Sequence, residues 1–358
     1  MMTRRPQQAL QGEDANRVWR VSRYPAPGEL VSRELFSWSQ EAIPAIADGE
    51  FLVRTICLAT GPAQRGYLHD QPGGFLDPLA IGAVMRGRGV GEIMASRHPD
   101  YRPGQIFVGS LGWQDYSVQH PRGADFVYST KVVSEPVRPL STTLGVLGNA
   151  GITAYFGLLD VGAMRAGETV VISAAAGGVG SVAGQIARIR GAGQVIGIAG
   201  TNGKCDWLCS DLGLHETINY RSQPVAGRLR ELCPDGVDVF FDNVGGEVLN
   251  DVLGHLAIGA RIAICGFIST DYDPDARHGP INYRKLVSRR ARMQGFVVFD
   301  YWDRFAEAEA DLQSWFRNGS LVNCEDVTEG LDRMPEALAS LFTGENRGIK
   351  ICRVAPDP

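Results

Sequence analysis

The sequence has no apolar run of the 18 or more residues that a membrane-spanning helix needs, and it has no excess of basic residues. It carries 35 lysines and arginines against 40 aspartates and glutamates, which gives a formal net charge of −5. Nucleic acids and anionic membrane surfaces select basic faces, so the composition favours neither as a partner. Arg4 and Arg5 near the start are not followed by an apolar segment, and we expect no signal peptide there.

The sequence also lacks the paired cysteines of a disulfide framework or a zinc lobe. Its seven cysteines are odd in number and scattered through apolar contexts, which is typical of reduced, packed thiols in a cytoplasmic protein. Cys205 and Cys209 are four residues apart, but no second pair completes a metal site, so we expect no bound metal. A G-x-S-x-G motif is absent as well, and no nucleophile–base pair is evident.

Glycine, by contrast, is abundant. The chain has 44 glycines in 358 residues, well above the usual share of about 7%. Because no repeat accompanies them, these glycines indicate tight turns and places where the backbone approaches a ligand or another backbone closely. The length fits two domains better than one.

The pattern of apolar residues divides the chain into two parts. Up to about Gly145, short apolar runs are separated by Gly/Pro turns, which predicts a β-rich domain with strands near residues 50–58, 84–94 and 105–108. Beyond it, apolar strands alternate with helices, as in the βαβ units of a parallel sheet. We expect these strands at 169–173, 195–199, 217–219, 237–241 and 261–265, and helices at 152–161, 182–190, 204–212 and 303–317. A last strand at 349–354 is expected to return to the first domain.

A glycine-rich turn follows the first of these parallel strands. The segment from Ala175 to Gly180 (AAGGVG) fits the G/A-x-G-x-x-G pattern, and it opens a helix as a dinucleotide site requires. The middle glycine lets the main chain approach a pyrophosphate, the last lets helix and strand pack closely, and the helix N-terminus offers free N–H groups. The alternative is a glycine-rich turn of an α/β domain without a nucleotide.

The residues after the second parallel strand distinguish the two nicotinamide cofactors. NAD-binding domains place an acidic residue there for the ribose 2′-hydroxyl, but residues 199–204 (AGTNGK) contain no carboxylate. Lys204 would neutralise a 2′-phosphate, and Arg221 could add to it, so the sequence predicts NADPH. The alternative for both side chains is an ordinary solvated charge.

Several motifs together resemble one family. They include GITAYFGLL from Gly151, DNVGG from Asp242, GENRGIK from Gly344 and, in the first domain, MRGRGVGE from Met85 and GWQDY from Gly112. They are similar to the zinc-independent branch of the medium-chain dehydrogenase/reductase superfamily, which includes leukotriene/prostaglandin reductases, plant alkenal double-bond reductases and bacterial curcumin-reductase-like enzymes. The resemblance implies an α/β protein: a GroES-like β-rich substrate domain (1–145 and 324–358) and a Rossmann NADPH-binding domain (146–323), assembled as a homodimer.

The resemblance also implies roles for individual residues. Thr153 and Tyr155 would lie on a helix that lines the cleft. The cofactor contacts would come from Gly177, Gly178 and Val179 at the pyrophosphate, Lys204 and Tyr220 at the adenosine phosphate, and Asn243 and Asn346 near the nicotinamide. Without the resemblance, turn chemistry would be the preferred interpretation of both asparagines. Tyr283 and Tyr272, the latter in a loop that would form a lid, are the candidate catalytic donors; the alternative is a pair of surface tyrosines.

The reaction implied is NADPH-dependent reduction of the C=C bond of an α,β-unsaturated ketone or aldehyde, with hydride transfer to the β-carbon. A quinone or ketone reductase on the same scaffold, and a non-catalytic NADPH-binding relative, are the alternatives. The sequence departs from the branch at residues 61–65 (GPAQR), where Asp-Pro-Tyr-Met-Arg is usual, and at Asn149 and Ala150, where Met-Pro is usual. Both changes fall where substrate would lie, which implies a smaller, more polar lining and a different substrate.

Overall fold

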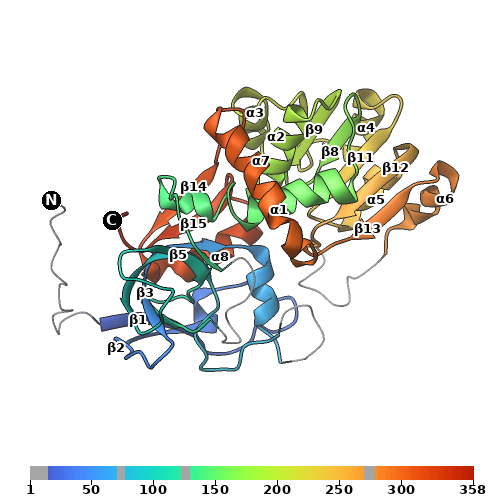
Figure 1. The fold of residues 1–358 in the computed structure, drawn as a ribbon. Helices are drawn as coiled ribbons and strands as arrows, with labels where there is room; N and C mark the ends of the chain where they lie inside the picture. The colour runs from blue at the N-terminus through green and yellow to red at the C-terminus, as the bar shows by residue number, and fades with distance from the viewer. Residues whose placement is uncertain (1–14, 71–76, 122–129, 270–278) are drawn as a thin grey trace.

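The computed structural model describes residues 15–70, 77–121, 130–269 and 279–358. Two bodies lie against each other: a β-rich body and a body built on a parallel sheet with helices on both faces (Figure 1). Within these residues, no helix has the length and apolar character needed to cross a membrane. The expected α/β class, with one β-rich and one parallel-sheet part, is confirmed.

The β-rich body contains a seven-stranded sheet and a two-stranded sheet. The larger sheet has the order β14-β15-β3-β4-β5-β7, and β6 also pairs with β3. Its strands are β3 (Phe51–Thr60), β4 (Arg88–Ser96), β5 (Ile106–Ser110), β6 (Tyr116–Gln119), β7 (Lys131–Val132), β14 (Glu325–Glu329) and β15 (Ile349–Arg353). The smaller sheet pairs β1 (Ala15–Val21) with β2 (Phe36–Ala42), and the helix α8 (Met334–Thr343) precedes β15.

The other body has a six-stranded parallel sheet with the order β10-β9-β8-β11-β12-β13. Its strands are β8 (Thr169–Ile172), β9 (Gln194–Ala199), β10 (Glu216–Asn219), β11 (Val237–Asp242), β12 (Leu256–Ile264) and β13 (Arg292–Gly295). Its helices are α1 (Asn149–Phe156), α2 (Gly178–Ile189), α3 (Asn202–Ser210), α4 (Val225–Leu232), α5 (Gly246–Leu253), α6 (Lys285–Arg289) and α7 (Phe305–Arg317). In chain order the strands read 3-2-1-4-5-6, the doubly wound order of dinucleotide-binding domains.

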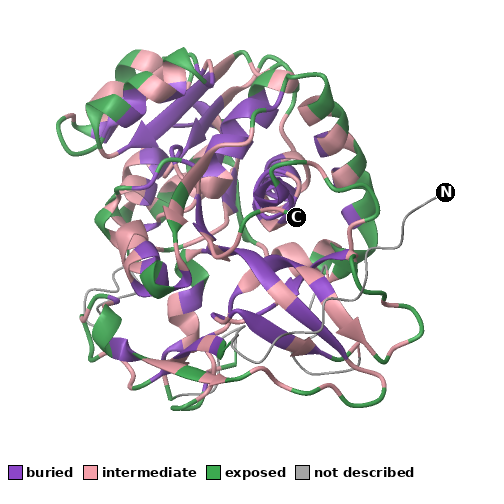
Figure 2. Ribbon diagram, turned by 90° about the vertical axis from the view of Figure 1, so that its left-hand side faces the viewer, coloured by how far each residue is buried: buried purple, intermediate pink, exposed green. Residues whose placement is uncertain are grey.

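The central strands β8, β9 and β11 of the parallel sheet are apolar at most positions and are buried on both faces. Val170 and Ile172 of β8 face the helices α1, α2, α3 and α7, whereas Val171 between them faces α4 and α5. Figure 2 shows buried colour along much of these central strands, with exposed residues on the outer faces of the helices. Successive side chains of a strand contact opposite faces of the sheet. Because both faces are covered, successive residues are all buried instead of alternating between buried and exposed.

Some elements differ from those predicted by the sequence. β12 begins at Leu256, five residues before the strand expected at 261, and pairs in parallel with both β11 and β13. β13 itself was not predicted, because its four residues, RMQG, are all exposed and show no apolar alternation. The helix expected from 152 begins at Asn149 and continues into a π-helical turn, Gly157–Val161.

The end of the chain returns from the parallel-sheet body to the β-rich body. β15 pairs antiparallel with β3 and parallel with β14, so the last segment completes the sheet of the β-rich body. Trp19 of β1, almost fully buried, donates its indole N–H to the carbonyl of Leu331 at 2.8 Å. The buried indole donor thus finds an acceptor 312 residues away, just before α8.

A substitution in α7 tests the packing of the parallel-sheet body. Leu312 is completely buried against α1, so Leu312→Ala leaves a cavity and should lower the free energy of unfolding by about 2–5 kcal/mol. Urea unfolding followed by far-ultraviolet circular dichroism measures the change. Ser314→Ala, on the exposed side of the same helix, is the matched control and should leave the midpoint nearly unchanged.

Candidate functional site

Five loops meet at the carboxyl edge of the parallel sheet. They follow β8, β9, β10 and β11, and the fifth, Gly344–Gly348, arrives from the β-rich body ahead of β15. Because β8 neighbours both β9 and β11, the strand order reverses there. Ligands of open parallel sheets bind at such a reversal point, outside the carboxyl ends of the strands.

The glycine turn after β8 is shaped by close backbone contacts. A Cβ on Gly180 would stand 2.3 Å from the carbonyl oxygen of Ala174, so only glycine allows α2 to pack this closely against the turn. A Cβ on Gly177 would meet only that same oxygen, at 3.2 Å, which leaves the outer side of the turn accessible. Gly177 caps α2, and the N–H groups of Gly178 and Val179 in its first turn have no intrahelical acceptor. The turn therefore fits a phosphate group.

The returning loop lies directly beside this turn. The Gly348 N–H donates to the Ala176 carbonyl at 2.8 Å, and Gly348 bridges to Gly177. Asn346 is buried, and its side-chain amide donates to the Gly348 carbonyl at 3.0 Å. The structure thus places Asn346 next to the glycine turn and also gives it the turn-stabilising hydrogen bond expected of an asparagine in such a loop.

Lys204 occupies the first turn of α3 and is only 8% exposed. Its ammonium donates to the Gly344 carbonyl at 3.0 Å, which links the loop after β9 to the returning loop. Burial, together with the like charges of Arg347 and Arg221, lowers the pKa of the Lys204 ammonium below its ordinary value. The alternative interpretation of Lys204 as a solvated surface charge is wrong.

Tyr220 and Arg221 follow β10 on the neighbouring loop. Tyr220 lies so close to Gly200 that a Cβ there would stand 3.1 Å from the tyrosine oxygen. Arg221 donates to the Thr343 carbonyl at 3.3 Å, and its guanidinium carbon is 5.9 Å from the Tyr220 ring centroid. Both side chains are exposed and border the same region as Lys204.

Arg347 also reaches this region, and it was not predicted from the sequence. One of its terminal nitrogens lies 3.2 Å from where a Cβ on Gly203 would stand, at the start of α3. Only the fold brings Arg347 to Lys204, since 142 residues separate them. The one available signal was its position in the GENRGIK motif, beside Asn346.

Asn243 follows β11 and is held by a buried polar network. Its side-chain amide donates to the Ser173 carbonyl at 2.7 Å, and its backbone N–H donates to the Ser173 hydroxyl at 2.8 Å. That hydroxyl donates to Asp242, whose carboxylate is fully buried and also accepts from the N–H groups of Val244 and Gly245. Burial raises the pKa of Asp242, while these hydrogen bonds act in the opposite direction.

The helix α1 carries Thr153 and Tyr155 on different sides. Tyr155 is buried and donates its hydroxyl to Asp311 of α7 at 2.9 Å, so it fastens two helices rather than lining an open space. Burial and Asp311 raise the pKa of its phenol. Thr153 is half-buried, and its hydroxyl makes no side-chain hydrogen bond to another described residue.

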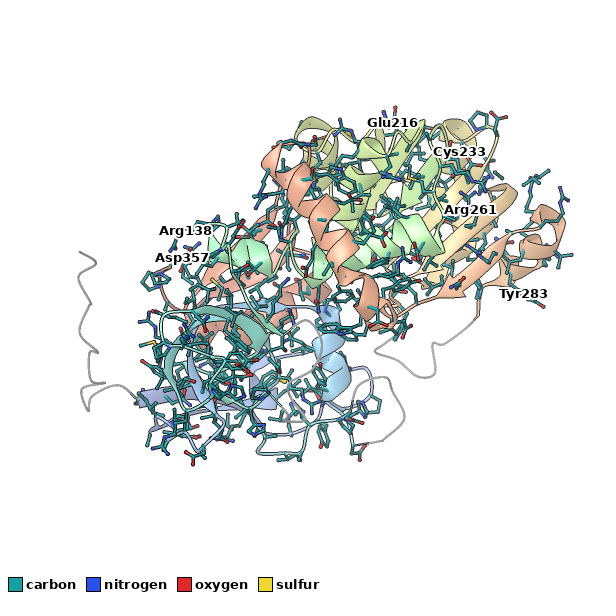
Figure 3. The ribbon with its side chains drawn as sticks, viewed as in Figure 1. Arg138, Glu216, Cys233, Arg261, Tyr283 and Asp357 are labelled. Atoms are coloured by element: carbon teal, nitrogen blue, oxygen red, sulfur yellow. The ribbon has the colours of Figure 1, made fainter. Side chains whose placement is uncertain are left out.

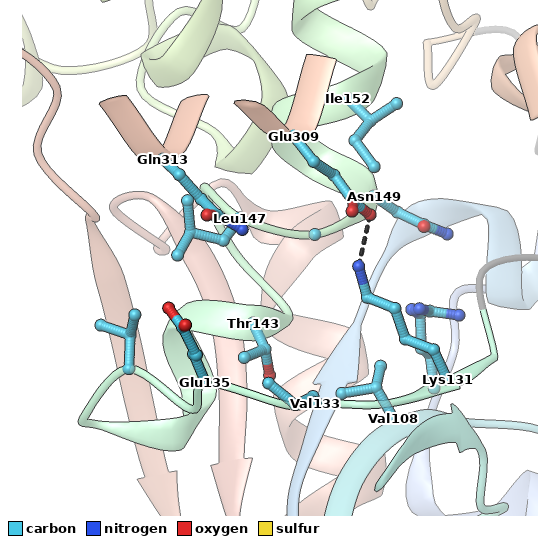
Figure 4. A pocket seen from close by; sticks show the side chains of 13 residues that line it. Val108, Lys131, Val133, Glu135, Thr143, Leu147, Asn149, Ile152, Glu309 and Gln313 are labelled. Atoms are coloured by element: carbon cyan, nitrogen blue, oxygen red, sulfur yellow. Dashed lines mark hydrogen bonds and ion pairs between the residues drawn. The ribbon is translucent and has the colours of Figure 1, made fainter. Parts of the chain in front are cut away.

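A pocket lies between the two bodies beside the start of α1 (Figure 4). Its empty space, part of which opens to solvent, is about 490 Å³. Lys131 from the β-rich body crosses it to form an ion pair with Glu309 of α7 at 2.5 Å. The lining combines polar side chains, among them Arg88, Thr143, Asn149 and Gln313, with valine, leucine and isoleucine side chains.

Of the two candidate catalytic tyrosines, the structure describes Tyr283 and does not bring it to these loops. Tyr283 lies in the 3-10 helix Ile281–Arg284, is 64% exposed, and points outward at the far edge of the parallel-sheet body (Figure 3). Tyr272 lies outside the described residues. Within residues 15–70, 77–121, 130–269 and 279–358, no group of three His, Cys, Asp or Glu side chains could hold a metal ion.

Comparison with known families and proteins covers nearly the whole chain. Residues 17–127 match the family described as the N-terminal domain of oxidoreductase, and residues 178–314 match the family described as zinc-binding dehydrogenase. The NADPH-dependent curcumin reductase of Escherichia coli K12 is 35% identical over 97% of this chain and 99% of its own. The NADP(+)-dependent 2-alkenal reductase of Nicotiana tabacum is 36% identical over 86% of this chain and 88% of its own.

A solved structure agrees with these relatives. CurA from Vibrio vulnificus, in complex with NADPH, matches with a TM-score of 0.87 and 35% identity over 95% of this chain and all of that one. The motifs that predicted the family, the strand order and the matches with known proteins all agree. This chain is an oxidoreductase, and it belongs to the curcumin and alkenal reductase branch of the medium-chain dehydrogenase/reductase superfamily.

Proposed function

We propose that this protein is an NADPH-dependent reductase of carbon–carbon double bonds conjugated to a ketone or aldehyde. The observation that supports this most strongly is the buried Lys204 with Arg221 near the glycine turn, in a region where residues 199–204 include no acidic residue. A pyrophosphate fits the turn, and a 2′-phosphate fits the cations. The names of the curcumin and 2-alkenal relatives support the choice of an activated double bond.

The described residues fit the cofactor, and each would have a definite part in holding it. The outer side of the turn at Gly177, Gly178 and Val179 would receive the pyrophosphate, and Lys204 and Tyr220 would hold the 2′-phosphate end. Asn243, Asn346 and Thr153 would contact the ribose and nicotinamide side from three different elements. When bound, the cofactor supplies a hydride.

In the proposed reaction the β-carbon of the substrate accepts the hydride, and negative charge develops on the carbonyl oxygen. Hydrogen-bond donors aimed at that oxygen stabilise the enolate, and water or a protein hydroxyl protonates the α-carbon. We propose residues 1–145 and 324–358 as the substrate domain and 146–323 as the cofactor domain, so the reaction would take place where the two bodies meet.

Turnover measurements on a panel of compounds test the function. With NADPH, 2-alkenals and enones should be reduced to products that gain two hydrogens and keep the carbonyl, as mass spectrometry would show. NADH should give at least about a tenfold lower kcat/KM, because the cations near Lys204 then lack a partner. Simple ketones and quinones form the comparison arms. Reduction of ketones to alcohols, or equal use of NADH, would contradict the proposal.

Tyr283 is proposed as the donor to the carbonyl oxygen, with Tyr272 in the preceding loop. Replacement Tyr283→Phe removes only the hydroxyl and, if that hydroxyl binds the developing oxyanion, should lower kcat on an enone about 100-fold or more. Tyr301→Phe, at a half-buried tyrosine of the same body, is the control. An unchanged kcat would remove Tyr283 from the mechanism and agree with its exposed position in the single chain.

We propose a homodimer that uses the edge of the parallel sheet. All four residues of β13, the edge strand of the parallel sheet, are exposed. The exposed apolar side chains here are Met293 (38%) of β13 itself, Ile258 (63%) of β12 and Val287 (83%) of α6. An edge strand with apolar neighbours is a surface that another chain covers in many proteins.

Substitution on this edge tests the dimer. Val287→Glu places a charge among the exposed apolar side chains and should shift the mass measured by light scattering from dimer toward monomer. Leu30→Glu, at an exposed leucine of the β-rich body, should leave the mass unchanged. A monomeric wild-type protein would exclude this interface.

A further inference from the structure

Three cations from three separate segments converge at the start of α3. Lys204 lies on α3, Arg221 follows β10, and Arg347 comes from the returning loop before β15. Lys204 and Arg221 both donate to carbonyls of residues 343–344, and Arg347 stands over Gly203. Within the described part of the chain, none of the three forms an ion pair with a carboxylate.

This arrangement is unfavourable unless an anion joins it. Burial and the two arginines act together on Lys204 and lower the pKa of its ammonium, whereas the opposing effects of Asp326 and Glu345 are smaller. Asp326 is already engaged by Lys350 at 2.7 Å. Like charges held together without counter-charge raise the free energy of the site, and a bound dianion would remove that cost.

Backbone groups at the same place favour an anion too. The backbone N–H of Lys204 donates to both the side-chain oxygen and the carbonyl of Thr201, and the backbone N–H of Cys205 donates to the same carbonyl. Asn202 and Gly203, which precede Lys204 in this nine-residue helix, are left with N–H groups that have no intrahelical acceptor. Gly203 has no side chain, so the guanidinium of Arg347 can approach this end of the helix.

From these contacts we infer that Arg347 is a specificity-determining residue that binds the 2′-phosphate of NADPH together with Lys204. This rests on the proposed function and extends it to a residue of the returning loop. The same loop meets the glycine turn through Gly348, so one short segment would contact both phosphate-bearing ends of the cofactor's adenosine half. Arg347 is exposed, so its guanidinium is accessible to an anion that binds beside the buried Lys204.

Binding of 2′,5′-ADP and 5′-ADP to the full-length protein, measured by calorimetry, tests the inference without turnover. Arg347→Met keeps most of the side-chain length and removes the charge, so the affinity for 2′,5′-ADP and NADPH should fall about tenfold, or about 1.4 kcal/mol. The affinity for 5′-ADP and NADH should not change. Arg353→Met, on β15 just after this loop and paired with Glu329 at 2.8 Å, is the matched control and should behave like the wild type.

The pH dependence gives a second readout. In the wild type, affinity for 2′,5′-ADP is lost as pH rises through the lowered pKa of Lys204, because the neutral amine no longer attracts phosphate. Removing Arg347 takes away a like charge, raises that pKa and should move the loss of affinity to higher pH. Arg353→Met leaves the charge of Arg347 in place and should not produce this shift.

The outcomes separate the inference from the function on which it rests. If Lys204→Met weakens binding of 2′,5′-ADP and Arg347→Met does not, Arg347 has no part in phosphate recognition and the inference is overturned. Equal weakening of 2′,5′-ADP and 5′-ADP by Arg347→Met would also overturn it. If the wild type binds 2′,5′-ADP no better than 5′-ADP, the proposed NADPH dependence fails, and the inference fails with it.

Discussion

The site depends on a close contact between two stretches of backbone, the glycine turn after β8 and the loop that returns from the β-rich body. The Gly348 N–H bonds to Ala176 at 2.8 Å, and a Cβ on Gly178 would stand only 3.1 Å from the Ile349 Cα. Such an approach is possible only where side chains are absent. The contact also fixes where Asn346 and Arg347 lie, because they precede Gly348 directly. The glycines therefore shape the turn that we propose to bind the pyrophosphate, and at the same time they attach the second body to it.

Two buried charged groups lie at the carboxyl edge, and they differ in whether neighbouring groups balance their charge. Asp242 is completely buried, but the Ser173 hydroxyl and two backbone N–H groups satisfy its carboxylate. It is a structural anion that holds the turn carrying Asn243. Lys204 is nearly as buried, yet its neighbours are other cations and one carbonyl. A group whose charge is satisfied internally stabilises the fold, whereas a group left with excess charge is suited to a ligand.

The sequence predicted the parts of the site that depend on local pattern. The turn at Gly177–Gly180 was visible because strand, turn and helix follow each other within a few residues, and Lys204 was visible because an expected acid was missing nearby. The burial of Lys204 was not visible in the sequence, because it results from the contact with Gly344, 140 residues later. Arg347 was overlooked for the same reason. Tyr155 resembled a cleft residue in its motif, but α7 packs against it and takes up its hydroxyl. β13 has no apolar alternation and becomes a strand only because β12 offers it a free edge.

The same contrast between backbone and side chain explains how this chain can depart from its family on one side of the site only. The proposed cofactor side is fixed by the glycine turn and by carbonyl contacts, which tolerate little change. On the proposed substrate side, the 3-10 helix Pro62–Tyr67 is held by Gln64, which is buried, accepts from the Gly61 N–H and donates to the Arg86 carbonyl at 2.9 Å. Ala63, next to Gln64, is exposed and takes no part in that anchoring. A residue in this position can be exchanged without moving the helix. Asn149, at the start of α1, likewise has a side chain that faces the pocket in Figure 4 and can be exchanged while the backbone of the helix stays in place. In the proposed site, changes at these two positions would alter the lining that a substrate meets while the proposed cofactor side keeps its geometry. This is the pattern expected when a family retains one chemistry and varies what it acts on.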